Sequence, residues 1–230
     1  MVKSRVPKCH WKRPLGAASF WQDTRPIDPP ETTVDPKRSA LRDLLDQRCL
    51  EVGEFTLTTG QKSNFYFDCK KATLDGPTLV LMADAFLEEI RQLPTVPEAI
   101  GGLTMGADFI ASTVAMRAAQ LGDRTVQASI VRKEPKKHGT KNYIENQLPA
   151  GTTIVAVDDV VTSGKSTRLA CEKLEEAGYR IVGIVALLDR EAGGLEKLAQ
   201  DFKCPARSVL KKSHFPRLVE LLRQQEADSG

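Results

Sequence analysis

Residues 153–167 read TIVAVDDVVTSGKST, and this stretch decides the fold. Its apolar beginning predicts a strand over 152–157, which ends at two carboxylates, Asp158 and Asp159. A turn of small hydroxyl residues and one glycine follows, and we expect a helix over 166–177. An apolar strand followed by a short turn and an amphipathic helix is typical of a buried strand in a parallel sheet.

The same alternation of strand and helix continues on both sides of this stretch. We expect further strands at 99–103, 126–131, 181–188 and 207–210, and helices at 79–90, 107–121 and 215–223. The pattern predicts an α/β fold with a mainly parallel central sheet flanked by helices on both faces. Ligands of such sheets bind beyond the carboxyl ends of the strands, so the loops after 103, 131, 157 and 188 are the candidate site.

The N-terminal part of the chain has a different pattern. Several prolines deny residues 1–35 a regular backbone, and we expect a disordered tail there. A helix is expected to begin at Pro36, followed by a β-rich hood over about 50–70 with a turn at Gly60. The sequence therefore predicts a tail and one domain over 36–230.

Composition excludes several classes of protein. The 230 residues are 41% hydrophobic, yet no apolar run approaches the roughly 20 residues needed to span a bilayer, so no membrane segment is expected. A net charge of +3 is too small to indicate nucleic acid as the main partner. Five cysteines without a close pair indicate a reducing compartment, and we expect a cytoplasmic protein.

The turn after the acidic pair has the features of a phosphate site. Unpaired N–H groups and the dipole at a helix N-terminus attract an anion, and the hydroxyls nearby can donate to it. A nucleotide-triphosphate P-loop is excluded because it requires glycine where this chain has Asp159. The two carboxylates instead suit sugar hydroxyls beside the phosphate, or a metal ion held through water.

A strongly basic segment follows the predicted strand at 126–131. Between residues 132 and 141 there are five Lys or Arg and one histidine, against the single acid Glu134. Such a segment suits a polyanion, and a solvated basic loop explains the same charges equally well at this point.

These segments carry a resemblance to a known family. Residues 153–167 resemble the phosphoribosyl-pyrophosphate (PRPP) motif of the type I phosphoribosyltransferases. Three more segments resemble the orotate phosphoribosyltransferase family: 55–67 its N-terminal hairpin, 132–139 its catalytic loop, and 189–191 the Asp-Arg after the next strand. The matches occur in family order from about 38 to 225.

The resemblance implies a type I phosphoribosyltransferase fold and a reaction. Orotate and PRPP would give orotidine 5′-monophosphate and pyrophosphate, a step of de novo pyrimidine (UMP) biosynthesis. It implies Mg²⁺ held through PRPP and water with no direct protein ligand, and a homodimer whose basic loop reaches the partner's site. Nucleic acid and membrane partners are not expected.

The resemblance also implies a role for individual residues. Lys136, His138, Asp158 and Asp159 would be catalytic. The orotate site would include Thr162, Arg190, Tyr66 and Phe67. PRPP would be bound by Arg132, Lys133, Lys136, His138, Asp158, Asp159, Val160, Val161, Thr162, Ser163, Gly164, Lys165 and Ser166.

Two positions depart from the family pattern. This chain has Thr58 and Met105 where many members carry lysine. We expect the remaining cations to compensate for both losses. Two alternatives stay open: a phosphoribosyltransferase for another base, such as a purine, and a non-catalytic regulator that senses PRPP while binding nucleic acid.

Overall fold

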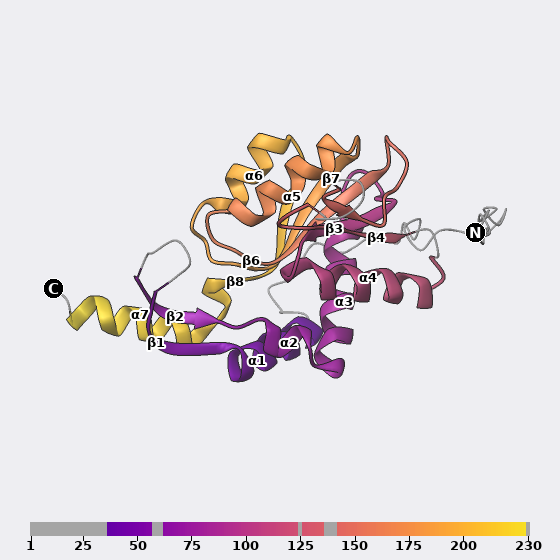
Figure 1. Ribbon diagram of the computed structural model, residues 1–230. Coiled ribbons are helices and arrows are strands. Elements are labelled where there is room, and N and C mark those ends of the chain that lie inside the picture. The colour runs from indigo at the N-terminus through magenta and orange to yellow at the C-terminus, as the bar shows by residue number, and fades with distance from the viewer. Residues whose placement is uncertain (1–35, 57–61, 124–125, 136–141, 229–230) are drawn as a thin grey trace, which may run out of the picture.

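The computed structural model describes residues 36–56, 62–123, 126–135 and 142–228 (Figure 1). Within these residues six strands form one sheet, in the order β5-β4-β3-β6-β7-β8. The strands are β3 (Ala99–Leu103), β4 (Gln127–Val131), β5 (Ile144–Glu145), β6 (Thr153–Val161), β7 (Arg180–Asp189) and β8 (Ala206–Lys211). Every neighbouring pair is parallel except β4 and β5. The predicted mainly parallel sheet is confirmed.

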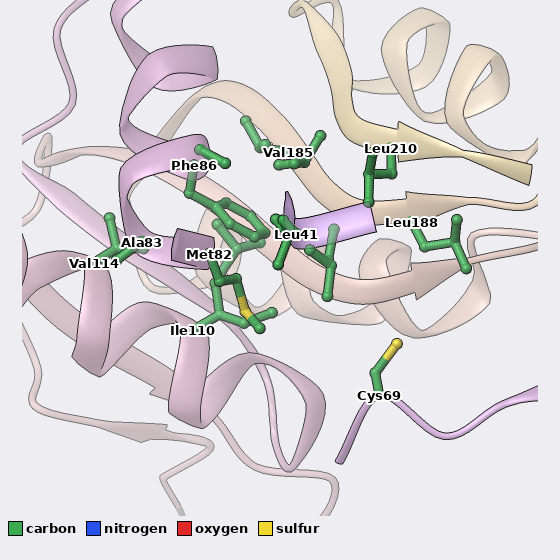
Figure 2. Close-up of a cluster of buried hydrophobic side chains, with 14 of the residues drawn as sticks. Leu41, Cys69, Met82, Ala83, Phe86, Ile110, Val114, Val185, Leu188 and Leu210 are labelled. Atoms are coloured by element: carbon green, nitrogen blue, oxygen red, sulfur yellow. The ribbon is translucent and has the colours of Figure 1, made fainter. Parts of the chain in front are cut away.

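Helices cover both faces of this sheet (Figure 1). One face carries α5 (Lys165–Glu176) and α6 (Gly194–Phe202), and the other carries α3 (Gly76–Arg91) and α4 (Gly106–Gln120). Two separate groups of buried apolar side chains result, one under each helical layer. Figure 2 shows the larger group, in which Phe86 and Met82 of α3 meet Ile110 of α4 and Val185 of β7.

The N-terminal hood is a two-stranded antiparallel sheet. Its strands are β1 (Leu50–Thr56) and β2 (Lys62–Phe67), and Leu50 pairs with Phe67 at its base. Phe67 packs edge-on against Phe215, with ring centroids 5.0 Å apart. The predicted β-rich hood is confirmed for these strands, while the turn expected at Gly60 and the tail over 1–35 lie outside the described residues.

The remaining helices are short or terminal. The structure has α1 (Pro36–Arg48) before the hood, α2 (Lys70–Thr73) after it, and the 3₁₀ turn η2 (Lys212–His214) and α7 (Pro216–Asp228) at the C-terminal end. The helix predicted to begin at Pro36 is confirmed. Gly178, with φ +86°, follows the end of α5, a position where glycine commonly ends a helix.

The structure differs from the sequence prediction in three elements. β6 does not end at Val157 but continues to Val161, because Asp158 finds buried hydrogen-bond partners and the apolar residues after the acidic pair keep pairing with β7. α6 was not predicted, since its nine residues give too short a periodic signal. The two-residue strand β5 gives no signal at all.

A buried carboxylate ties distant elements together. Glu89 of α3 is 2% exposed. Its Oε1 lies 2.5 Å from Nη2 of Arg38 on α1, and its Oε2 lies 2.5 Å from Nε of Arg207 on β8. Removing one partner of a buried ion pair is costly, so this triad fixes α1 against the edge of the sheet.

None of the helices in the described part of the chain is both long and apolar enough to cross a bilayer.

Candidate active site

Asp158 lies at the centre of the acidic pair and is satisfied from within the motif. Asp158 is 4% exposed. Oδ2 accepts hydrogen bonds from Ser166 Oγ (2.9 Å) and Thr167 Oγ1 (2.6 Å), both in the first turn of α5. Oδ1 accepts from the backbone N–H of Asp159 at 3.0 Å. The hydroxyl residues after the strand therefore hold the carboxylate as well as flank the helix N-terminus.

Burial changes the acidity of this carboxyl group. Removal from water, followed by repulsion from Asp159, raises the pKa of Asp158 to about 7, although the hydrogen bonds from Thr167 and Ser166 oppose the rise. A carboxyl group of this kind keeps its proton to a higher pH than an ordinary aspartate does. A cationic centre placed beside it would favour its ionised form, which suits a reaction that develops positive charge on a sugar.

Asp159 faces the turn after β3. Its Oδ1 accepts from the backbone N–H of Val160 at 2.9 Å. A Cβ atom on Gly106, the first residue of α4, would lie 2.7 Å from Asp159 Oδ1 and 3.0 Å from Asp158 Oδ1. Gly106 thus allows the start of α4 to approach both carboxylates, a role that sequence reasoning missed although the glycine-rich turn was visible.

The turn between β6 and α5 is shaped by two glycines. Gly164 precedes α5 with φ +74°, a left-handed conformation that glycine adopts without strain. Gly194, at the start of α6, packs so closely that a Cβ atom there would lie 2.2 Å from the carbonyl oxygen of Thr162. α6 therefore supports the predicted phosphate turn from behind, and the pair Gly193-Gly194 is the signal that could have indicated this.

A pocket of about 460 Å³ opens beside this turn. Its lining contains three basic side chains, two hydroxyls and one aromatic ring: Lys62, Arg190, Lys212, Ser63, Thr162 and Phe65. None of the described residues that line it is acidic. These residues come from β2, from the ends of β6 and β7, and from η2, so the pocket is assembled from four distant parts of the chain. A pocket with this lining favours a flat, negatively charged ligand.

Arg190 is fixed at one wall of this pocket. Its Nη2 donates to Ser63 Oγ at 3.1 Å, and its guanidinium carbon lies 4.2 Å from the centroid of the Phe65 ring. Burial lowers the pKa of Arg190 from its ordinary value. The side chain is thus pre-positioned by a hydroxyl and a ring face, the geometry in which a guanidinium can present two parallel donors to a carboxylate.

Two of the four residues predicted for the base site lie elsewhere. Arg190 and Thr162 both line the pocket. Tyr66 is 37% exposed with its ring 5.7 Å from that of Phe55, and Phe67 is buried against Phe215. Neither is among the lining residues, whereas Phe65 is. A role for the backbone of Tyr66 and Phe67 stays a prediction.

Two lysines of the pocket were missed as site residues. Lys62 stands at the start of β2, inside the segment that resembles the family hairpin, and the Gly-Gln-Lys-Ser run was its only signal. Lys212 begins η2. No motif marks Lys212 in the sequence, because only the fold brings the end of β8 next to β2 and Arg190.

The basic segment is only partly described. Arg132 follows β4, where its Nη1 lies 2.8 Å from Oε1 of Glu145 and its backbone N–H donates to the carbonyl of Tyr143. Lys133 is exposed next to it. Lys136 and His138 lie outside the described residues, so the predicted catalytic roles of this loop stay predictions.

The remaining predicted PRPP residues surround the acidic pair. Val160 and Val161 complete β6, Ser163 is exposed in the turn, and Lys165 and Ser166 are exposed at the start of α5. The exposed residues stand at the helix N-terminus, where an anion is favoured. Thr162 links these parts, because it directly follows β6, belongs to the turn and also lines the pocket.

Known proteins are similar to this chain in sequence and in fold. Residues 72–223 match the family described as the phosphoribosyl transferase domain. The orotate phosphoribosyltransferase of Synechocystis sp. is 42% identical over 160 residues, covering 69% of this chain and 79% of the relative. That of Nostoc sp. is 40% identical over 171 residues, covering 74% and 81%.

Solved structures are similar to this chain in fold as well. The Mycobacterium tuberculosis orotate phosphoribosyltransferase, in a crystal structure described as a complex with PRPP, matches at a TM-score of 0.64 and 28% identity, covering 80% of this chain and 99% of that one. The chain belongs to the type I phosphoribosyltransferases and, among them, to the orotate phosphoribosyltransferase family.

Proposed function

We propose that this chain transfers the phosphoribosyl group of PRPP to orotate, giving orotidine 5′-monophosphate and pyrophosphate in de novo UMP biosynthesis. It would thus act as a glycosyltransferase of the pentosyltransferase class. The observation that carries the choice of base is the pocket lined by Lys62, Arg190 and Lys212 with no acidic lining residue among those described. Orotate carries a carboxylate that such a pocket attracts, whereas a neutral purine gains nothing from three cations.

The acidic pair would bind the sugar. Displacement at the anomeric carbon develops positive charge on the ribose and negative charge on the departing pyrophosphate. Asp158 and Asp159 would accept hydrogen bonds from the ribose hydroxyls and stabilise the cationic sugar. Because the pKa of Asp158 is raised to about 7, the approaching positive charge would complete its ionisation.

The turn at 162–166 would bind the 5′-phosphate. The N-terminus of α5 and the hydroxyls of Thr162 and Ser163 would offer donors, and Gly164 permits close approach of the backbone. Thr162 lines the pocket as well as the turn, so it would contact both substrates. The anomeric carbon would then lie between the acidic pair and the base pocket.

The donor set of this site fits Mg²⁺ held by substrate. Within the described residues, no three His, Cys, Asp or Glu side chains gather so as to hold a metal ion directly. Asp158 and Asp159 are engaged in hydrogen bonds, and they would contact the ion through water, as Mg²⁺ prefers. Bound in this way, Mg²⁺ would neutralise pyrophosphate charge.

The basic segment would complete the site. Lys136 and His138 would close over the pyrophosphate as a lid and exclude water, with Arg132 and Lys133 at its base. We further propose a homodimer in which each loop serves the partner's site, and a cytoplasmic location. Lys136→Ala should depress turnover far more than PRPP affinity, and an equal turnover would remove the lid role.

One assay tests the assignment. The absorbance of orotate should fall when the protein, Mg²⁺ and PRPP are mixed, and should not fall when PRPP is left out. Parallel reactions with hypoxanthine and adenine test the purine alternative, and turnover of either without turnover of orotate would overturn the proposal. PRPP binding without turnover of any base would instead favour the regulator.

A further inference from the structure

Lys212 enters the base pocket from a part of the chain that carries no family motif. It is half-buried at the start of η2, directly after β8. It lines the pocket together with Lys62 of the hood and Arg190 of the loop after β7. Three elements that are far apart in sequence thus contribute one cation each to a single pocket.

The turn that carries Lys212 is held by hydrogen bonds from Ser213 to Glu191. The carboxylate of Glu191 accepts two hydrogen bonds from Ser213, one from its backbone N–H to Oε2 (2.8 Å) and one from its Oγ to Oε1 (3.0 Å). Ser213 is the residue after Lys212. Both carboxylate oxygens are therefore engaged by the turn, and the position of Lys212 depends on Glu191.

The contact between Glu191 and Ser213 and the wall of the pocket both depend on the loop after β7. Glu191 follows Arg190, so that Arg190 contacts Ser63 and Phe65 in the pocket while Glu191 contacts Ser213. Glu191 has φ +53°, a left-handed conformation that a non-glycine residue adopts at some cost. The N–H of Glu191 donates to Asp189 Oδ1 at 2.8 Å, which helps to hold this conformation. This left-handed conformation at Glu191 allows Arg190 to contact the pocket while Glu191 contacts Ser213.

The charges agree with this arrangement. Burial opposes ionisation of Glu191, but the hydrogen bonds from Ser213 and the nearby charges of Lys212 and Lys211 lower the pKa of its carboxyl group overall. Glu191 is thus an anion at neutral pH. It holds the turn from a position outside the pocket lining.

We infer that Lys212 is a specificity-determining residue that binds the carboxylate of the pyrimidine together with Arg190, and that Glu191 is a positioning residue that holds it there through Ser213. This inference deepens the proposed function and rests on it. The recognised chemistry is a carboxylate on a planar ring, so removing the Lys212 charge should affect ligands that carry the carboxylate and spare those that lack it.

The test compares two nucleotides that differ only in that carboxylate, orotidine 5′-monophosphate and UMP. Lys212→Met keeps most of the apolar stem and removes the charge, and Lys211→Met is the matched control at an adjacent lysine outside the pocket lining. Dissociation constants are measured by titration calorimetry. We expect Lys212→Met to weaken orotidine 5′-monophosphate about 10-fold, equivalent to about 1.4 kcal/mol, and UMP less than about 2-fold.

Lys212→Arg should restore most of the preference, and Lys211→Met should leave it unchanged. Equal losses for both nucleotides, or no loss for either, would overturn the role of Lys212. Melting temperatures of the variants separate binding effects from misfolding.

A double-mutant cycle tests whether Glu191 positions Lys212. Glu191→Gln should reduce the preference for orotidine 5′-monophosphate about 3-fold, and adding it to Lys212→Met should cause no further loss, because both changes remove one interaction. Additive losses would overturn the positioning role. If the wild-type protein prefers orotidine 5′-monophosphate yet does not turn over orotate, the proposed function fails while the carboxylate site stands. If it turns over orotate and Lys212→Met behaves like Lys211→Met, only the inference about Lys212 fails.

Discussion

The two halves of the candidate site are built in opposite ways. The sugar-phosphate half is local, because Asp158 is held by Ser166 and Thr167, a few residues further along one strand and helix. The base half is assembled from β2, the ends of β6 and β7, and η2. The local half draws its side chains from one stretch of sequence, against which Gly106 and Gly194 pack, whereas the assembled half draws its side chains from four parts of the chain. Substitutions should therefore separate the two halves cleanly.

The largest effect is expected at Gly106, which touches only the acidic half. A Cβ atom there would meet both carboxylates and would push Asp159 from the position in which it accepts a hydrogen bond from Val160. We expect Gly106→Ala to lower kcat/KM for PRPP by about 100-fold or more. Gly76→Ala is the control, since nothing lies within 4 Å of its added methyl group. Steady-state kinetics with varied PRPP measure both, and equal values would show that the close approach of α4 is not needed.

Glu89 lies in neither half, and its replacement should affect stability rather than binding. Glu89→Gln leaves Arg38 and Arg207 without their shared buried anion, which we expect to cost about 3 kcal/mol of unfolding free energy. Glu88→Gln is the neighbouring control: its carboxylate also lies 3.9 Å from Arg38 but is 34% exposed, so its loss should cost much less. Urea unfolding measures both. A change in KM at unchanged stability would contradict the separation.

Arg190 tests the assembled half. Arg190→Ala removes the guanidinium held by Ser63 and Phe65, and we expect kcat/KM for orotate to fall about 50-fold, as for loss of one buried charged contact. Arg180→Ala, at the other end of β7, should have no such effect. The dissociation constant of PRPP, measured without orotate, should stay within about 2-fold of wild type. A matching loss of PRPP affinity would show that the two halves are coupled.

The last expected effect concerns the pH dependence of stability. The pKa of Asp158 rises from 3.8 to about 7 on folding, so the folded chain keeps a proton that the unfolded chain releases. The free energy of unfolding should therefore fall as pH rises from about 4 to about 7 and level off above. Asp158→Asn should remove this component. Urea midpoints at several pH values measure it, and parallel curves for the two proteins would disprove the shift.

The same contrast explains what the sequence could predict. Residues 153–167 indicated the parallel sheet, the acidic pair and the phosphate turn because the side chains that carry these features lie within one short stretch. The base-site roles of Thr162 and Arg190 were predicted only through the family resemblance. Lys212, Gly106 and Gly194 were missed because their roles arise from contacts between elements, and no local pattern encodes those contacts.

Errors in element boundaries have the same origin. β6 was expected to end at the acidic pair, because carboxylates seldom lie within a buried strand. The hydroxyls of α5 make Asp158 tolerable there, and this compensation appears only once helix and strand are packed. α6 is short, and its position behind the phosphate turn depends on Gly194 rather than on hydrophobic periodicity.

The Glu89 triad has a consequence for how the chain folds as it is made. Arg38 is synthesised early and Arg207 late, while Glu89 needs both to satisfy its two oxygens. A nascent chain that has passed Glu89 but has not reached β8 would have to bury a carboxylate with half of its partners. The domain should therefore complete its folding only after the ribosome has released the last strand, so the two ends of the domain become native together.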